Sequence, residues 1–258
     1  MNIRETVAQL RGKAKSVYTH TLQRSYLRLF GHQVEQRFAI VGNARTGSNY
    51  LLDGLNSSPS IRMYHEIFAS HNREVGKDFE KTLSTVYQYE SKSTKIVGFK
   101  VFYNHLTEDE WKKFVAHRDL KIIHLTRRNR LRTVISLEIA FKTGQWTKAG
   151  NSGGPKEKRV TLDPLKLVRR LEQIEEGEAA TRARFCDRQM LESVYEEMVQ
   201  SPNEVFASVA AFLGADGIDP GKIRLKRQNP ERLAQLIVNY DKVEAVLKNT
   251  RFAEYLES

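Results

Sequence analysis

Cysteine is almost absent from this chain, which has one such residue, Cys186, among 258. A lone thiol cannot form an intramolecular disulfide, so a packed core must supply the stability. The sequence also lacks an apolar run of about 18 residues, the length that a membrane-spanning helix needs, and shows no charged-then-apolar leader. We therefore expect a protein of the reducing cytoplasm, in which the Asn56-Ser57-Ser58 sequon carries no glycan.

Acidic residues are few relative to basic ones. The chain has 31 Asp and Glu residues against 42 Lys and Arg residues, which gives a net charge of +11. This balance favours an anionic partner, such as a bis-phosphorylated nucleotide, an acidic glycan, nucleic acid or an anionic membrane. With 40% hydrophobic and 28% charged residues, the composition is that of a globular domain with a full core.

The N-terminal region differs from the rest. Residues 1–35 combine many cations with spaced apolar side chains, which predicts a basic amphipathic helical extension ahead of a single domain over 36–258. We expect the extension to pack on that domain or on a second subunit of a homodimer. Peripheral membrane contact is the alternative.

Strands and helices are expected to alternate along the domain. The strands are predicted at Phe38–Val41, Ile61–Tyr64, Lys95–Val101, Leu120–Leu125 and Met190–Ser193. The helices are predicted at Ser48–Asn56, Phe79–Tyr89, Glu108–His117 and Leu131–Phe141, and after Asp163-Pro164, Ser201-Pro202 and Asn229-Pro230. Thr107 and Glu110 form a capping-box pattern. This alternation predicts an α/β, P-loop-like three-layer fold with a central parallel sheet flanked by helices.

The segment from Arg37 to Asp53, RFAIVGNARTGSNYLLD, carries the most chemistry. A short strand runs through a turn bounded by Gly42 and Gly47 into a helix, and the unpaired N–H groups of such a turn bind phosphate. The spacing matches the first part of a Walker A loop, but Ser48 stands in place of its Lys and Asn49 in place of its Ser or Thr. We expect a phosphorylated nucleotide here, without a metal ion and without γ-phosphoryl transfer.

Three motifs together resemble the sulfotransferases that use 3′-phosphoadenosine 5′-phosphosulfate (PAPS). The turn Arg45-Thr46-Gly47-Ser48 is the first motif, and the segment KIIHLTRRNRLRTVIS, residues 121–136, is the second, with Arg128 and Ser136 at the family's separation. The sequence is most similar to the bacterial branch that sulfates carbohydrates and glycolipids. Members of that branch commonly read RTGS, then Glu-x-Phe, then RRN, which appear here as Arg45–Ser48, Glu66-Ile67-Phe68 and Arg127-Arg128-Asn129.

The resemblance implies a cofactor site for PAPS, whose product is adenosine 3′,5′-bisphosphate (PAP). Arg45 would offset the charge that develops on the bridging oxygen as the S–O bond breaks. Arg128 and Ser136 would bind the 3′-phosphate, with Lys226 and Arg227 in a basic loop that closes over it. The 5′-phosphate and the sulfate oxygens would be bound by Thr46, Gly47, Ser48 and Asn49.

Glu66 is the candidate general base. It follows the second predicted strand, at the edge of a parallel sheet where ligands gather, and a carboxylate there can take the proton of a hydroxyl acceptor. His65 is the rival, because adjacent side chains on a strand point to opposite faces. Lys100 after the third strand could neutralise the sulfuryl group or could simply be solvated, and both readings stay open. His105 and His124 have no metal-ligand partner at a convincing spacing and are taken as structural.

The acceptor is predicted from the long segment Lys142–Val160. Its glycines and lysines are typical of a surface loop, which could act as a lid over the acceptor or be a disordered connector. Trp146 could stack on a sugar ring. Anionic groups of the acceptor could be bound by Lys148, Lys156, Lys158 and Arg159. We expect a carbohydrate or glycolipid hydroxyl rather than a small phenol.

Two other function classes compete with this interpretation. A P-loop nucleotide kinase would explain the first loop, but it requires a Lys after Gly47 and an acidic magnesium ligand at a strand end. A nucleic-acid-binding protein would explain the charge. However, the basic segment RRNRLR contains no reader motif and no aromatic side chain, so no nucleic-acid partner is expected.

Overall fold

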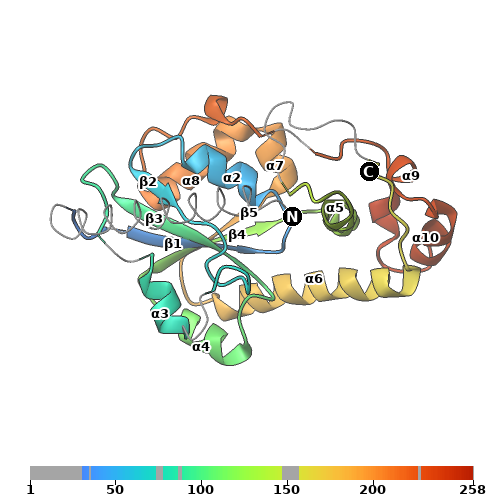
Figure 1. Ribbon diagram of the computed structural model, residues 1–258, viewed down its shortest axis with the longest axis horizontal. Helices are drawn as coiled ribbons and strands as arrows, with labels where there is room; N and C mark the ends of the chain where they lie inside the picture. The colour runs from blue at the N-terminus through green and yellow to red at the C-terminus, as the bar shows by residue number, and fades with distance from the viewer. Residues whose placement is uncertain are drawn as a thin grey trace, which may run out of the picture.

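The computed structural model describes residues 31–34, 36–73, 78–86, 89–146, 157–225 and 228–257. Its centre is a parallel five-stranded sheet in the order β2-β3-β1-β4-β5 (Figure 1). The strands are β1 (Gln36–Gly42), β2 (Ile61–Met63), β3 (Ile96–Phe102), β4 (Leu120–Thr126) and β5 (Met190–Val194). All five predicted strands are present, and their ends differ from the prediction by at most two residues.

Helices cover both faces of the sheet (Figure 1). One face carries α2 (Ser48–Leu55), α7 (Tyr195–Gln200) and α8 (Pro202–Leu213). The other carries α3 (Phe79–Ser84), α4 (Glu108–Ala116) and α6 (Pro164–Arg184). Phe38 and Ile40 of β1 belong to the hydrophobic cluster of α2 and α8, whereas Ala39 and Val41 belong to the cluster of α3 and α4. Because alternate residues of the strand serve opposite layers, β1 is apolar from Phe38 to Val41, and the three-layer α/β fold is confirmed.

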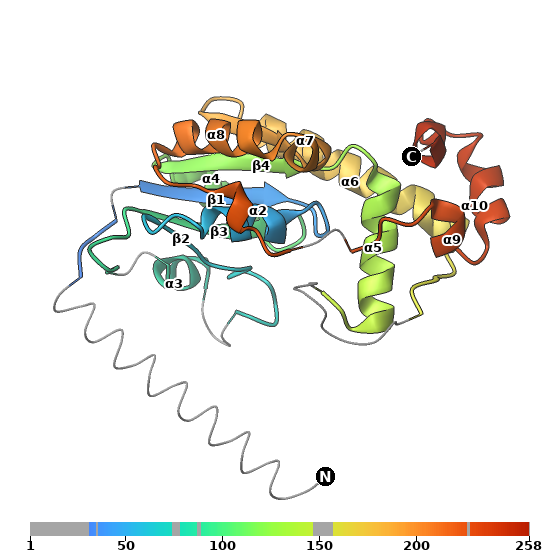
Figure 2. The same ribbon diagram turned by 90° about the horizontal axis from the view of Figure 1, so that it is seen from above.

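A third hydrophobic cluster lies beyond the end of the sheet. Its helices are α5 (Arg130–Thr143), α9 (Leu233–Leu236) and α10 (Tyr240–Leu247), together with part of α6 and the 3₁₀ turn η2 (Ala253–Glu257). A separate 3₁₀ turn, η1 (Pro220–Lys222), packs on α8. Leu131 and Ile135 of α5 pack there with Leu171 of α6 and with Val243 and Leu247 of α10. Figure 2 shows α5 running across the carboxyl ends of the strands, with α9 and α10 on its far side.

Side-chain caps explain several of the helix starts. The Thr107 hydroxyl accepts the N–H of Glu110, whose carboxylate accepts the N–H of Thr107, which is the predicted capping box. Asp163 caps α6 by accepting the N–H groups of Leu165 and Lys166, and Pro164 follows it in the first turn.

Two helix boundaries differ from the prediction by more than two residues, and one helix was missed. Helix α3 ends at Ser84 rather than Tyr89, because the hydroxyls of Ser84 and Thr85 bond to carbonyls of their own last turn. The C-terminal helical segment begins at Leu233 rather than directly after Pro230. Helix α7 was not predicted at all.

Among the described residues no helix combines the length and the apolar content needed to cross a bilayer. The N-terminal extension lies outside the described residues apart from a few of its last ones, so the division at residue 36 stays a prediction.

The strand order locates the crevice of the fold. After the central β1 the chain forms the edge strand β2 and returns to form β3 between β2 and β1, and it then continues on the other side of β1 with β4 and β5. In open α/β sheets, ligands bind beyond the carboxyl ends of the strands at the point where the order reverses. That point lies between the loop after β1, which carries Arg45 and Gly47, and the loop after β4, which carries Arg127 and Arg128.

Candidate active site

The loop between β1 and α2 has the geometry of an anion-binding turn. Gly47 is the N-cap of α2 with φ +91°, and Arg45 also has a left-handed backbone, with φ +68°. A Cβ at Gly42 would overlap the carbonyl oxygen of Leu125 on β4, so the start of the turn requires glycine. The Thr46 hydroxyl donates to the carbonyl of Asn43 at 2.8 Å and closes the turn. The first N–H groups of α2 therefore face the crevice with the positive end of the helix dipole.

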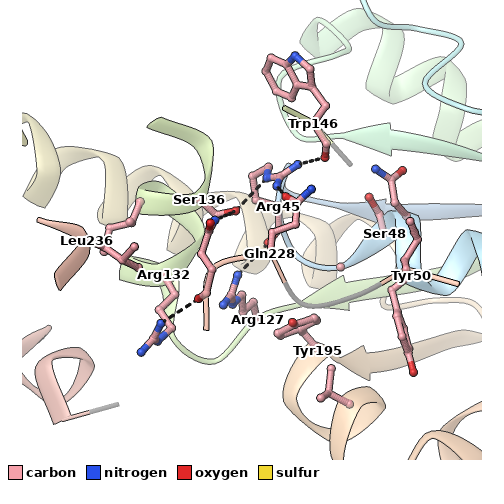
Figure 3. A pocket seen from close by; sticks show the side chains of 16 residues that line it. Arg45, Ser48, Tyr50, Arg127, Arg132, Ser136, Trp146, Tyr195, Gln228 and Leu236 are labelled. Carbon is pink, nitrogen blue, oxygen red and sulfur yellow. Dashed lines mark hydrogen bonds between the residues drawn. The ribbon is translucent and has the colours of Figure 1, made fainter. Parts of the chain in front are cut away.

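A pocket of about 950 Å³, measured out to its open mouth, lies above this loop (Figure 3). Its walls come from five parts of the chain. They are Arg45 and Gly47 to Tyr50 from the first loop and α2; Arg127, Arg132, Ile135 and Ser136 from the loop after β4 and α5; Trp146; Tyr195 and Val199 of α7; and Leu225, Gln228, Asn229 and Leu236.

The Arg45 side chain is held by contacts from three of these segments. Its Nε donates to Ser136 Oγ at 3.0 Å, its Nη1 donates to the carbonyl of Trp146 at 2.6 Å, and its Nη2 donates to Gln228 Oε1 (Figure 3). Burial lowers the pKa of the guanidinium from its usual value, and the charge of Glu66 opposes that shift. The structure thus brings together Arg45 and Ser136, which the sequence placed in separate motifs.

Glu66 lies beside a buried lysine. Lys100 Nζ donates to Glu66 Oε1 at 3.0 Å and to Asn49 Oδ1 at 2.7 Å, and the lysine is only 1% exposed. Burial lowers the pKa of Lys100, and the Glu66 carboxylate opposes the shift. Of the two readings of Lys100, the solvated one is wrong. The ammonium group connects the candidate base to the first turn of α2.

His65 lies differently from the prediction. The argument from strand alternation does not apply to it, because β2 ends at Met63 and both His65 and Glu66 lie in the following loop. The residue is exposed, and its carbonyl accepts the N–H of Lys100 at 3.2 Å. Partial burial of the ring and the charge of Lys100 lower the pKa of His65. Glu66, in contrast, forms the ion pair with Lys100.

Arg128 and Arg127 follow β4 but have different surroundings. The Arg128 side chain is 61% exposed and forms an ion pair with Glu197, and it is not among the residues that line the pocket. Arg127 is 8% exposed, lines the pocket and donates from Nη1 to the carbonyl of Arg45 at 3.2 Å. The assignment of Arg128 to the 3′-phosphate stays a prediction.

Sequence reasoning missed several residues of the pocket. Tyr195 directly follows β5, at the sheet edge where ligands gather, and this position could have pointed to it. Gln228 and Asn229 line the pocket, whereas Lys226 and Arg227, which were predicted next to them, lie outside the described residues.

Two ends of the segment Lys142–Val160 are described. Trp146 lines the pocket and packs edge to face on Phe141, with ring centroids 5.1 Å apart. Lys158 Nζ donates to the carbonyl of Gln228 and to Glu231 Oε1, both at 2.7 Å. Both ends therefore reach the groups that surround the pocket. Lys148 and Lys156 lie outside the described residues.

Comparisons with known proteins find relatives that match most of this chain at 25% identity. The chain is 25% identical over 232 residues to Nodulation protein H of Rhizobium tropici, which covers 85% of this chain and 92% of the relative. It is also 25% identical over 237 residues to Nodulation protein H of Rhizobium meliloti strain 1021, covering 86% and 95%. The chain resembles the sulfotransferases. No protein-family model matches it.

Sulfotransferases are also found among the solved structures that resemble this fold. The sulfotransferase from Alicyclobacillus acidocaldarius has a TM-score of 0.47 and 19% identity, covering 83% of this chain and 94% of that one. The mouse sulfotransferase SULT7A1, solved in complex with PAP, has a TM-score of 0.45 and 17% identity, covering 77% and 64%.

Proposed function

We propose that this protein is a sulfotransferase that transfers a sulfuryl group from PAPS to a hydroxyl of a carbohydrate or glycolipid. The observation that carries the proposal is the joint placement of Arg45 and Glu66 around the crevice of the sheet. Arg45 points into a pocket beside a phosphate-binding turn, and Glu66 is tied to that turn through Lys100 and Asn49. The turn proposed to bind the nucleotide and the carboxylate proposed to accept the proton therefore lie at the same edge of the sheet.

The residues present fit a bis-phosphorylated nucleotide. The left-handed turn at Arg45 and Gly47 offers N–H groups to the 5′-phosphate end, and the arginines of the opposite wall, Arg127 and Arg132, supply positive charge. Thr46, Ser48 and Asn49 belong to the same turn, and Ser136 adds a hydroxyl from α5. We assign the 3′-phosphate to Arg128 and Ser136, with Lys226 and Arg227 as further ligands. This assignment requires Arg128 to exchange Glu197 for the nucleotide.

The chemistry follows from the groups around the crevice. PAPS, when bound, supplies the sulfuryl group and leaves as PAP. Glu66 accepts the proton of the acceptor hydroxyl, whose oxygen forms the new bond to sulfur as the old S–O bond breaks. The Arg45 guanidinium stabilises the charge left on the departing phosphate oxygen. Lys100, which contacts both Asn49 and Glu66, fixes the distance between the two ends and adds positive charge beside the transferred group.

The acceptor class rests on the mouth of the pocket. Trp146 is 47% exposed there and is anchored to Arg45 through its carbonyl, so a ring bound against the indole would lie near the transferred group. Exposed indole faces suit the apolar face of a sugar, and Lys158 and Arg159 offer charge to anionic substituents. These features favour a carbohydrate or glycolipid hydroxyl. A cytoplasmic location, a homodimer and membrane contact through residues 1–35 stay predictions.

A thermal-shift series tests the proposal against its competitors. Adenosine 3′,5′-bisphosphate, ATP with Mg²⁺ and a short oligonucleotide are added separately, and a ligand that binds the native state raises Tm. We expect PAP to raise Tm equally with and without EDTA, and the other two to have little effect. Stabilisation by ATP that EDTA abolishes would instead indicate a kinase, and stabilisation by the oligonucleotide alone would indicate a nucleic-acid-binding protein.

A further inference from the structure

Behind the nucleotide loop lies a pair of side chains, Arg127 and Tyr195, of which the proposed function uses only the positive charge of Arg127. The guanidinium carbon of Arg127 lies 4.6 Å from the centre of the Tyr195 ring, a cation–π arrangement. Arg127 comes from the loop after β4, and Tyr195 opens α7 after β5. Both line the pocket, and Figure 3 shows them beneath Arg45.

Each member of the pair touches the nucleotide loop at a different residue. Arg127 Nη1 donates to the carbonyl of Arg45 at 3.2 Å. The Tyr195 ring packs against Gly47 so closely that a Cβ on this glycine would overlap Tyr195 Cδ2 and lie 3.0 Å from Cε2. The pair therefore contacts both ends of the turn Arg45-Thr46-Gly47.

The turn needs such support because of its backbone. Arg45 is the one residue other than glycine with a positive φ, +68°, in the described part of the chain. Residues with a Cβ avoid this region, and they persist in it only where the surroundings over-determine the conformation. The hydrogen bond from Arg127 to the Arg45 carbonyl fixes the orientation of the peptide group between Arg45 and Thr46.

We propose that Arg127 and Tyr195 form a brace that holds Arg45 in its left-handed conformation, which makes Arg127 a positioning residue for the proposed sulfuryl transfer. The inference rests on the proposed function, since it concerns the same loop. It differs from the simple expectation for a cation in the RRN motif, which is direct contact with a phosphate. Arg127 acts instead through the backbone of Arg45, and it thereby sets the direction of the N–H groups and of the Arg45 side chain.

Two substitutions at Arg45 separate the brace from direct contact. Arg45→Ala and Arg45→Gly both remove the guanidinium, but only glycine also removes the strain of a positive φ. Arg127→Gln is therefore combined with each, and PAP affinity is measured by calorimetry. If the brace acts on strain, we expect Arg127→Gln to weaken PAP binding about tenfold in the Arg45→Ala protein, the weight of one charged hydrogen bond. In the Arg45→Gly protein we expect a change of less than about threefold. Equal losses in both backgrounds would overturn the brace and assign Arg127 to the phosphate directly.

Arg188 provides a matched control away from the loop. Its guanidinium also stacks on an aromatic ring, 5.2 Å from the centre of Phe185, and it also donates to backbone carbonyls, those of Val115 and His117. Arg188→Gln is expected to lower Tm while PAP affinity stays within about twofold of the parent. A fall in PAP affinity as large as that of Arg127→Gln would show that the loss reports general destabilisation, which would also refute the proposal.

A second readout separates failure of the brace from failure of the proposed function. If the parent protein binds no PAP, the proposed function is wrong, and the brace is then tested by urea unfolding of the same four combinations. Strain relief predicts that Arg127→Gln destabilises the Arg45→Ala protein more than the Arg45→Gly protein. Equal destabilisation of both would exclude the brace independently of any ligand.

Discussion

Replacement of Gly47 by alanine should damage both the fold and the nucleotide site. Two costs combine at this position. A left-handed φ of +91° is unfavourable for a residue with a Cβ by about 1 to 2 kcal/mol. The new methyl group would also overlap the Tyr195 ring and lie 3.2 Å from Met198 Cε, and overpacking of this kind costs about 1 to 3 kcal/mol. We therefore expect a total loss of about 2 to 5 kcal/mol in the free energy of unfolding.

Gly214 allows the two costs to be separated. It has φ +67°, and a Cβ built on it meets nothing within 4 Å, so Gly214→Ala includes the backbone cost alone. That cost is about 1 to 2 kcal/mol, the same as the backbone part of the loss at Gly47. Urea unfolding of both variants gives the stabilities, and calorimetry with PAP gives the affinities. The reasoning is refuted if Gly47→Ala is as mild as Gly214→Ala and binds PAP as the parent does.

Four further predictions test the site and its surroundings. Glu66→Gln should lower kcat by about a hundredfold while PAP affinity is nearly unchanged, and normal turnover would move the base elsewhere. Arg128→Ala should weaken PAP binding by about 1.5 to 3 kcal/mol in calorimetry, and unchanged affinity would remove it from the 3′-phosphate site. Deletion of Gly150 to Lys158 should raise the acceptor KM strongly in steady-state assays at constant nucleotide affinity, whereas unchanged kinetics would make the segment a linker. Burial lowers the pKa of His124 to about 4 against the opposing charge of Glu192, so the folded state binds fewer protons than the unfolded state and stability falls as pH drops from about 6.5 towards 4. This contribution amounts to about 2 kcal/mol at pH 5, and urea unfolding should show an acid-side loss that is smaller by this amount in His124→Gln than in the parent. A loss of similar size remains in the variant, because burial also lowers the pKa of His105 to about 4.

The parts of the fold that could be predicted are those that local rules determine. The continuous apolar run of β1 and the capping box at Thr107 act over a few residues, and both appear in the structure as expected. The end of α3 was misplaced because the hydroxyl of Thr85 competes for backbone carbonyls, which is a weaker local signal than the apolar pattern. Helix α7 is short and was missed because six residues carry little periodicity.

The candidate site also combines features that the local sequence determines with features that depend on packing between distant segments. The glycine-dependent turn after β1 could be predicted from Gly42 and Gly47, because its requirement for glycine is local, whereas phosphate binding by this turn stays a prediction. The burial of Lys100 could not, since it depends on α2 covering the end of β3. Likewise, nothing in the sequence near Tyr195 reveals that its ring meets Gly47, a residue far away in the sequence.

The contacts of Arg45 have a consequence for how the protein is made. Its side chain bonds to Ser136 and Gln228, which are 91 and 183 residues further along the chain, and its carbonyl bonds to Arg127, 82 residues away. Contacts of such large sequence separation form slowly, because the chain must lose the conformational entropy of a long loop before the contact can form. On the ribosome, the N-terminal half emerges first and presents an incomplete turn until the segment around Gln228 has been synthesised. The proposed nucleotide site is therefore complete only after the segment around Gln228 has been synthesised, and a nascent chain that ends before it should show no protection from proteolysis by PAP.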